Sequence, residues 1–190
     1  NLNERVGIRI GDFVVDLKSL HVLGYLDNLP FTIDDFNSKT LNNLMAKGKA
    51  GTRRLRNRIS KLLSLECEDL KANKHHVDQT LISVSEIEMC MPVEIGDYTD
   101  FYSSKEHATN VGTMFRDPKN ALLPNWLWIP VGYHGRASSV IPSGVPIHRP
   151  KGQTKPDDSN PVFGPSKLVD FELEMAFVTY DGKPLGDSIS

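Results

Sequence analysis

The stretch RVGIRIGDFVVDL, residues 5–17, decides how the first half of the chain begins to fold. Apolar residues alternate with Gly7 and Arg9 before Gly11 and Asp12, and apolar residues recur at every second position from Phe13 to Leu17 after them. Alternation with a period of two is typical of a strand that buries one face, and a Gly-Asp pair suits a two-residue turn. The stretch therefore predicts an antiparallel β-hairpin.

Two amphipathic helices are predicted after this hairpin. Apolar residues recur at helical spacing over residues 41–45, with Ser38 as a candidate N-cap and Gly48 as the residue that ends the helix. A second apolar stripe follows over residues 55–63, and basic side chains occupy the other faces of that helix. A basic face can contact an acidic partner, but it is more often an ordinary solvated surface.

The distribution of proline and glycine divides the chain near residue 92. Pro30 is the only one of the 12 prolines that precedes Pro92, and 9 of the 14 glycines follow Pro92. Because proline and glycine mark turns and loops, the second part is predicted to contain short strands joined by long turns, as in a β-rich barrel, roll or sandwich. We therefore predict two domains, residues 1–92 and residues 93–190.

Composition excludes several classes of protein. The 190 residues carry 22 basic and 24 acidic side chains, so the net charge of -2 provides no general attraction to nucleic acid or to an anionic membrane. The most apolar stretch, residues 121–133, is interrupted by two prolines and cannot span a bilayer. Two cysteines are too few for a disulfide framework. We expect no nucleic-acid or membrane partner, and a reducing, cytosolic compartment.

A candidate metal site lies in residues 168–178, where apolar and polar residues alternate as in a strand. Glu172 and Glu174 stand two residues apart, so on a strand they would project from the same face about 7 Å apart. A hard divalent cation such as calcium, magnesium or manganese would satisfy both carboxylates. Taken alone, a Glu-x-Glu motif more often lies on a strand face that meets water.

Candidate catalytic residues are concentrated in residues 96–112, which carry carboxylates, phenols and an imidazole. His107 suits general base catalysis near neutral pH, although a single histidine is more often a surface residue. Arg116 can bind a substrate carboxylate through two hydrogen bonds, or it can pair with the adjacent Asp117. Tyr133 lies in the glycine-bracketed loop VGYHGR, a second candidate binding segment.

Four motifs closely resemble the fumarylacetoacetase family in their order and spacing: DYTDFY at residues 97–102 with His107, NALLPNW at 120–126, GYHGR at 132–136 and FELEMA at 171–176. The resemblance extends through the hairpin and the stretch TLNNLM, so it covers essentially the whole chain. It implies a mainly β fold with some helix (α+β), in which an SH3-like N-terminal barrel precedes a β-roll catalytic domain. Family members continue well beyond this point, so we expect an N-terminal fragment with an incomplete β-roll.

The resemblance also implies an activity, that of a cytosolic, metal-dependent hydrolase of tyrosine and phenylalanine breakdown. Its substrate would be a small β-diketo acid, 4-fumarylacetoacetate, which is cleaved at a carbon–carbon bond to fumarate and acetoacetate. A bound cation would polarise the substrate carbonyl while a histidine activates water. Calcium (Ca2+), a second site for magnesium (Mg2+) and a homodimer belong to the same expectation.

Particular residues take roles by their position in these motifs. The resemblance implies His107 as the catalytic base, Tyr102, Arg116 and Tyr133 as substrate-binding residues, and Asp100, Glu172 and Glu174 as calcium ligands. Family motifs that lie beyond residue 190 include a further metal ligand and the glutamate that orients the base. Because a histidine without its orienting partner is a poorer base, we expect residues 1–190 alone to be inactive.

Two alternatives stay open. A related acylpyruvate hydrolase would share the catalytic part, but such proteins usually lack this kind of N-terminal domain. A non-catalytic metal-binding scaffold of the same fold would have lost the histidine or a carboxylate, whereas Asp100, His107, Glu172 and Glu174 are all present.

Overall fold

The predicted hairpin is present in the structure, a computed structural model that describes residues 4–179 and 182–188. Strands β1 (Gly7–Ile10) and β2 (Phe13–Asp16) pair antiparallel. Gly11, in the turn between them, has a φ of +57°, a backbone conformation that glycine adopts without steric cost. The prediction from residues 5–17 is therefore confirmed.

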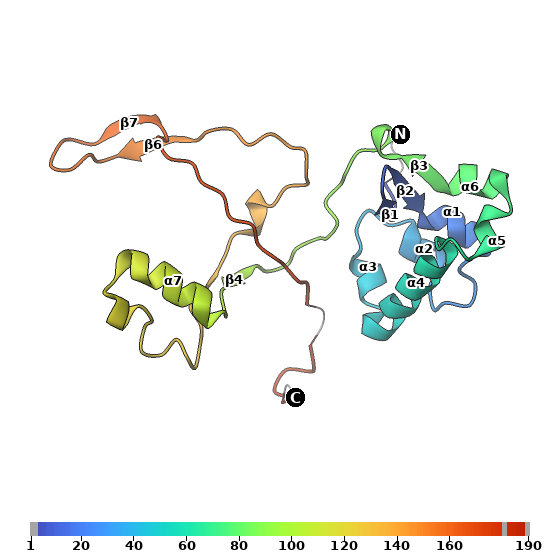
Figure 1. The fold of residues 1–190 in the computed structure, drawn as a ribbon, viewed down its shortest axis with the longest axis horizontal. Helices are drawn as coiled ribbons and strands as arrows, with labels where there is room; N and C mark the ends of the chain where they lie inside the picture. The colour runs from blue at the N-terminus through green and yellow to red at the C-terminus, as the bar shows by residue number, and fades with distance from the viewer. Residues whose placement is uncertain (1–3, 180–181, 189–190) are drawn as a thin grey trace. The chain divides into compact units, whose positions relative to one another are not determined.

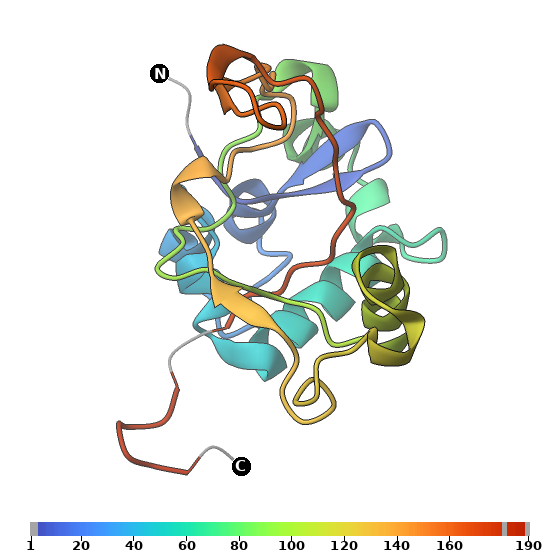
Figure 2. The ribbon, with the colours of Figure 1, turned by 90° about the vertical axis from the view of Figure 1, so that its left-hand side faces the viewer.

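A series of helices connects the second strand to the third. The chain runs from β2 directly into α1 (Leu17–Val22) and continues through α2 (Ile33–Phe36), α3 (Asn42–Met45), α4 (Gly48–Leu62), α5 (Glu68–Lys71) and α6 (Lys74–Thr80). β3 (Leu81–Ser83) then pairs antiparallel with β2, and the short 3-10 helix η1 (Val84–Glu86) follows it. The sheet has the order β1-β2-β3, which leaves β1 and β3 at its edges (Figures 1 and 2).

Both helices predicted from apolar spacing form, but the first begins later than expected. The N-cap of α3 is Leu41 rather than Ser38, and α3 ends at Met45. Gly48, which has a φ of +74°, is the first residue of α4 rather than the residue that ends α3. The apolar stripe of α4 is buried as predicted, because Leu55, Ile59 and Leu62 are each 4% exposed or less.

The helices bury an apolar core against one face of the sheet. The side chains with at most 1% exposure include Val15, Leu17, Leu20, Leu26, Phe36 and Leu62. These residues come from β2, α1, α2, α4 and the segment between α1 and α2, so the core joins elements that are distant in sequence. Burial of apolar surface is the main stabilising contribution to such a domain.

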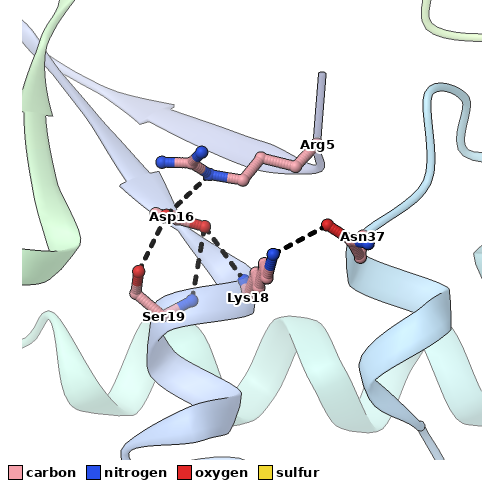
Figure 3. Close-up of polar contacts among 5 residues, drawn as sticks. All are labelled: Arg5, Asp16, Lys18, Ser19 and Asn37. Carbon is pink, nitrogen blue, oxygen red and sulfur yellow. Dashed lines mark hydrogen bonds and ion pairs between the residues drawn. The ribbon is translucent and has the colours of Figure 1, made fainter. Parts of the chain in front are cut away.

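A buried carboxylate fixes the passage from strand to helix. Asp16 is 3% exposed and is the N-cap of α1, where its Oδ1 accepts hydrogen bonds from the backbone N–H groups of Lys18 and Ser19 at 3.0 and 3.3 Å. Its Oδ2 accepts from Ser19 Oγ and from Arg5 Nε, both at 2.8 Å (Figure 3). Lys18 Nζ donates to Asn37 Oδ1 at 2.9 Å, which links α1 to the residue after α2. Hydrogen bonds and an ion pair thus compensate the burial of this charge.

The fold class is mixed α and β with small antiparallel sheets, rather than mainly β. Helical residues outnumber strand residues in the described chain, and no closed barrel is found there, so the SH3-like barrel is not confirmed. The physical reason is the shortness of the strands, which have three or four residues each, while the intervening chain forms helices that cover the sheet. No helix within the described residues has the length and apolarity that a bilayer span requires.

Residues 93–141 form a separate compact unit. Its elements are β4 (Thr99–Phe101), α7 (Lys105–Phe115), the 3-10 turns η2 (Pro118–Asn120) and η3 (Ala137–Ser139), and β5 (Gly132–His134), which pairs with β4. The Pro- and Gly-rich composition predicted little helix here beyond a turn near residues 104–107. An eleven-residue helix forms instead, because Ser104 caps its first turn and packing buries its face at Ala108 and Gly112.

Residues 142–179 contain one hairpin and a long extended segment. β6 (Lys151–Thr154) pairs with β7 (Val162–Pro165), drawn in orange in Figure 1. The strand predicted over residues 168–178 is not present, since this segment is in no sheet among the described residues. A strand needs a partner for its backbone hydrogen bonds, and alternation of side chains alone cannot supply one. The described part therefore shows no β-roll.

Candidate functional site

Pairing of β4 with β5 brings two of the predicted site residues together. Asp100 lies directly opposite Tyr133, and the Tyr133 hydroxyl donates a hydrogen bond to Asp100 Oδ2 at 2.7 Å. Asp100 is half-buried, whereas Tyr133 is 61% exposed. One carboxylate oxygen of Asp100 is thus held by a phenol, and the hydroxyl of Tyr133 has a fixed position at the surface of this unit.

A glycine extends the contact between these strands. The Gly135 N–H donates to the carbonyl oxygen of Tyr98 at 2.8 Å, just beyond the ends of β4 and β5. A Cβ atom at Gly135 would overlap the ring of Tyr98. Gly135, the second glycine of the GYHGR motif, is therefore required for close packing. This packing keeps Tyr133 and the following residues against β4.

The start of α7 places the predicted base beside an aromatic side chain. Ser104 caps the helix, and its Oγ accepts a hydrogen bond from the His107 backbone N–H at 3.2 Å. The ring of Tyr102 meets the His107 ring edge-on, with centroids 6.0 Å apart and an interplanar angle of 89°. The same Tyr102 ring lies 6.2 Å from the ring of Trp126, which is 6% exposed. His107 is exposed, so its imidazole is open to water and to a substrate.

Arg116 ends α7 and is held by a backbone acceptor. Its Nη1 donates to the Ala121 carbonyl oxygen at 2.8 Å, and the side chain is otherwise exposed. The adjacent Asp117 instead accepts from the backbone N–H of Lys119 at 2.8 Å and caps η2. The alternative of an Arg116–Asp117 ion pair is not found among the ion pairs of the described residues.

Glu172 and Glu174 lie in the extended segment of residues 166–179, and both are exposed. Within the described ranges, no group of three or more histidine, cysteine, aspartate or glutamate side chains is close enough to hold a metal ion. The structure assembles Asp100 with Tyr133, and Tyr102 with His107. The role of Asp100, Glu172 and Glu174 as calcium ligands stays a prediction.

A glycine inside α7 provides a test of how this unit packs. A Cβ atom at Gly112 would overlap the carbonyl oxygen of Ala121, the residue that also accepts from Arg116. We expect Gly112→Ala to destabilise the unit by about 1–3 kcal/mol, because the helix must move away from this loop. Hydrogen exchange of the α7 amides in the complete protein would measure the loss.

The matched control for this variant is Gly96→Ala in the same unit. A Cβ at Gly96 meets nothing within 4 Å, and its φ is not positive. We expect this control to be neutral or slightly stabilising. Equal protection of α7 in both variants would contradict the packing described here.

Known proteins resemble this chain along its whole length. Residues 1–92 match a family model described as fumarylacetoacetase N-terminal. A fumarylacetoacetase from Dictyostelium discoideum is 48% identical over 193 residues, which cover 100% of this chain and 45% of that relative. The chain belongs to the fumarylacetoacetase family.

The Homo sapiens fumarylacetoacetase is 50% identical over 97% of this chain and 44% of its own length. The Caenorhabditis elegans fumarylacetoacetase is 51% identical over 92% and 42%, respectively. The chain thus spans less than half the length of these relatives.

Two residues that position the site in this family member were not assigned a role from sequence. Ser104 caps α7 and orients its first turn, and the spacing from Ser104 to the backbone N–H of His107 is the usual one for an N-cap. Trp126 is part of the NALLPNW motif, and it packs against Tyr102. A serine three residues before a helical histidine was a detectable signal, whereas the Trp126 contact depends on how the loop after α7 folds back.

Proposed function

We propose that the complete protein is a fumarylacetoacetase, which hydrolyses a carbon–carbon bond of 4-fumarylacetoacetate to fumarate and acetoacetate in tyrosine and phenylalanine breakdown. The observation that carries the proposal is the contact between Tyr102 and an exposed His107, in a unit where Asp100 is also held by Tyr133. Support also comes from relatives that bear this name and are 43–51% identical to the chain.

His107 would act as the general base. Its imidazole is exposed at the first turn of α7, and the ring of Tyr102 contacts it edge-on. A ring nitrogen of His107 would accept a proton from water, and the resulting hydroxide would add to the substrate carbonyl. The bond to the neighbouring carbon would then break, and the electron pair would leave with acetoacetate as its enolate, which is protonated to the product.

Tyr102, Arg116 and Tyr133 would orient the substrate. Arg116 uses one N–H of its Nη1 for the Ala121 carbonyl, so its other donors can bind a carboxylate. Tyr102 directly follows β4, and its hydroxyl can donate a hydrogen bond to an oxygen atom of a diketo acid, whereas the Tyr133 hydroxyl donates to Asp100 and can accept a hydrogen bond from the enol form of the substrate. Alignment of water, carbonyl and base in this way can lower a barrier by several kcal/mol.

The donor chemistry of Asp100, Glu172 and Glu174 fits a hard divalent cation, because carboxylate oxygens are the ligands that calcium and magnesium prefer. Glu172 and Glu174 are exposed, and Asp100 has a carboxylate oxygen besides the one that accepts from Tyr133. We propose these three residues as the ligands of a calcium ion in the complete protein. When bound, such an ion polarises a carbonyl group and stabilises an enolate.

We expect Glu174→Gln to weaken calcium binding by the complete protein about tenfold or more, because a neutral amide replaces a charged ligand. Isothermal titration with calcium would measure the affinity of both proteins. Glu106→Gln is the matched control, since Glu106 is an exposed glutamate on α7 and its carboxylate accepts a hydrogen bond from Ser104. Equal calcium affinity in Glu174→Gln and the parent would exclude Glu174 as a ligand.

The activity itself is tested with purified complete protein. Loss of substrate absorbance, together with detection of fumarate and acetoacetate, would support the proposed reaction. Turnover of an acylpyruvate but not of 4-fumarylacetoacetate would contradict it.

The finer architecture is part of the same proposal. We propose an N-terminal domain of residues 1–92, related to an SH3-like barrel, and a catalytic β-roll that begins in residues 93–190 and is completed by later residues. The exposure of Phe171, Leu173 and Met175, at 88–97%, supports this proposal, because a partner strand would cover such apolar side chains. We also propose a magnesium site, a homodimer and a cytosolic location for the complete protein. Residues 1–190 alone are expected to be inactive.

A further inference from the structure

Residues 4–92 contain a groove of about 560 Å³ that the proposed catalytic residues do not use. This volume lies in the range of small-molecule binding sites. The floor of the groove is the sheet face opposite the core, because Val15 points into the core while its neighbours Val14 and Asp16 line the groove. The walls come from residues 38–41 and 86–92.

Arg5 is a fixed cation on the floor of this groove. Its Nε donates to Asp16 Oδ2 at 2.8 Å, and Asp16 is itself 3% exposed and held by the N-terminal backbone of α1. The two terminal amino groups of Arg5 make no hydrogen bond with any residue that the structure describes, and Figure 3 shows Nε as the engaged nitrogen. The planar end of a guanidinium group matches a carboxylate through two parallel hydrogen bonds.

The walls of the groove carry negative charge and apolar side chains. Lys39 pairs with Glu4 at 3.1 Å, which compensates that carboxylate. Glu86 and Glu88 are exposed and, within the described residues, form neither an ion pair nor a side-chain hydrogen bond. The apolar lining includes Val14, Ile82, Ile87, Met89 and Met91. Arg9 also lines the groove, where its Nε donates to the Gly11 carbonyl oxygen at 3.1 Å, so the lining presents cations as well as carboxylates and favours a ligand that carries both charges.

We propose that this groove binds an α-amino acid with an apolar side chain. The ligand carboxylate pairs with the terminal amino groups of Arg5, the ammonium group faces Glu86 and Glu88, and the side chain contacts the apolar lining. This inference does not depend on the proposed hydrolase activity, because every lining residue lies between residues 4 and 92.

The test is isothermal titration of the complete protein with L-leucine and two analogues of similar shape. 4-Methylpentanoate lacks the ammonium group, and 3-methylbutylamine lacks the carboxylate. We expect L-leucine to bind and each analogue to bind at least about tenfold more weakly, because each loses one charge-assisted contact. Absence of L-leucine binding at millimolar concentration, or equal binding of either analogue, would overturn the proposal.

Two variants locate the binding. Arg5→Lys keeps a positive charge beside Asp16 but loses the paired donors, so we expect its affinity for L-leucine to fall about tenfold or more. Glu88→Gln changes an exposed side chain of the groove wall, and we expect it to weaken L-leucine binding as well. This variant provides an independent test if Arg5→Lys does not fold. Arg53→Gln on the outer face of α4 is the control and should bind like the parent. Parental affinity in every variant that folds would rule out this groove.

Discussion

Replacement of His107 with alanine in the complete protein is expected to lower turnover by about a hundred- to ten-thousandfold, the usual contribution of a general base. The side chain of His107 is exposed and contacts the ring of Tyr102, so its removal opens no core cavity. Calcium affinity and the circular dichroism spectrum should therefore remain close to those of the parent. Initial rates of substrate loss, measured at several substrate concentrations, would separate turnover from binding.

The control for this variant is His75→Ala in the N-terminal part of the chain. His75 is an exposed histidine on α6, and its Nε2 lies 3.1 Å from Gln79 Nε2. This control should retain nearly all activity, because it removes the same chemical group far from Tyr102 in the sequence. If His107→Ala kept more than about a tenth of the parental rate, His107 would not be the essential base.

The largest effect on stability is expected for Phe36→Ala, which should destabilise the N-terminal core by about 3–5 kcal/mol. Phe36 is fully buried, and its ring packs against Phe31 with centroids 5.6 Å apart and against His21 at 5.4 Å. Removal of the ring leaves a cavity among side chains that come from several helices. Hydrogen exchange of the α1 and α4 amides in the complete protein would report the lower opening free energy.

Phe13→Ala is the matched control for the core variant. Phe13 is 47% exposed on β2, so its replacement removes a ring that is already half in water. We expect a loss of about 1 kcal/mol or less. Similar losses of amide protection in both phenylalanine variants would contradict the core described here.

Local patterns in the sequence predicted the elements whose geometry depends on neighbours along the chain. The hairpin around Gly11 follows from the alternation of residue types and from a two-residue turn. Both features lie within residues 5–17, and the strands on either side of the turn pair with each other. Helix α4 follows from an apolar stripe whose members are three or four residues apart. The same kind of reasoning failed for residues 168–178, because the partner that a strand requires lies elsewhere in a chain and leaves no trace in the alternation itself.

The candidate site likewise combines residues that the sequence indicated with contacts that only the structure shows. Its residues were selected by motif, and the roles of Asp100, His107, Glu172 and Glu174 stay predictions. The contact of Tyr133 with Asp100 joins residues 33 positions apart, and only the register of β4 with β5 specifies it. The contact of Tyr102 with Trp126 likewise requires the loop after α7 to return to the start of that helix.

By itself, the sequence determined the family, the hairpin, the apolar face of α4 and the residue types available for catalysis. Only the tertiary structure decided that helices cover the small N-terminal sheet, that Asp16 is buried while it holds Arg5, and that a groove lies on the opposite sheet face. The reason is physical. Periodicity reports which face of an element can be buried, whereas the partner of each face and of each charge is chosen by packing between segments distant in sequence.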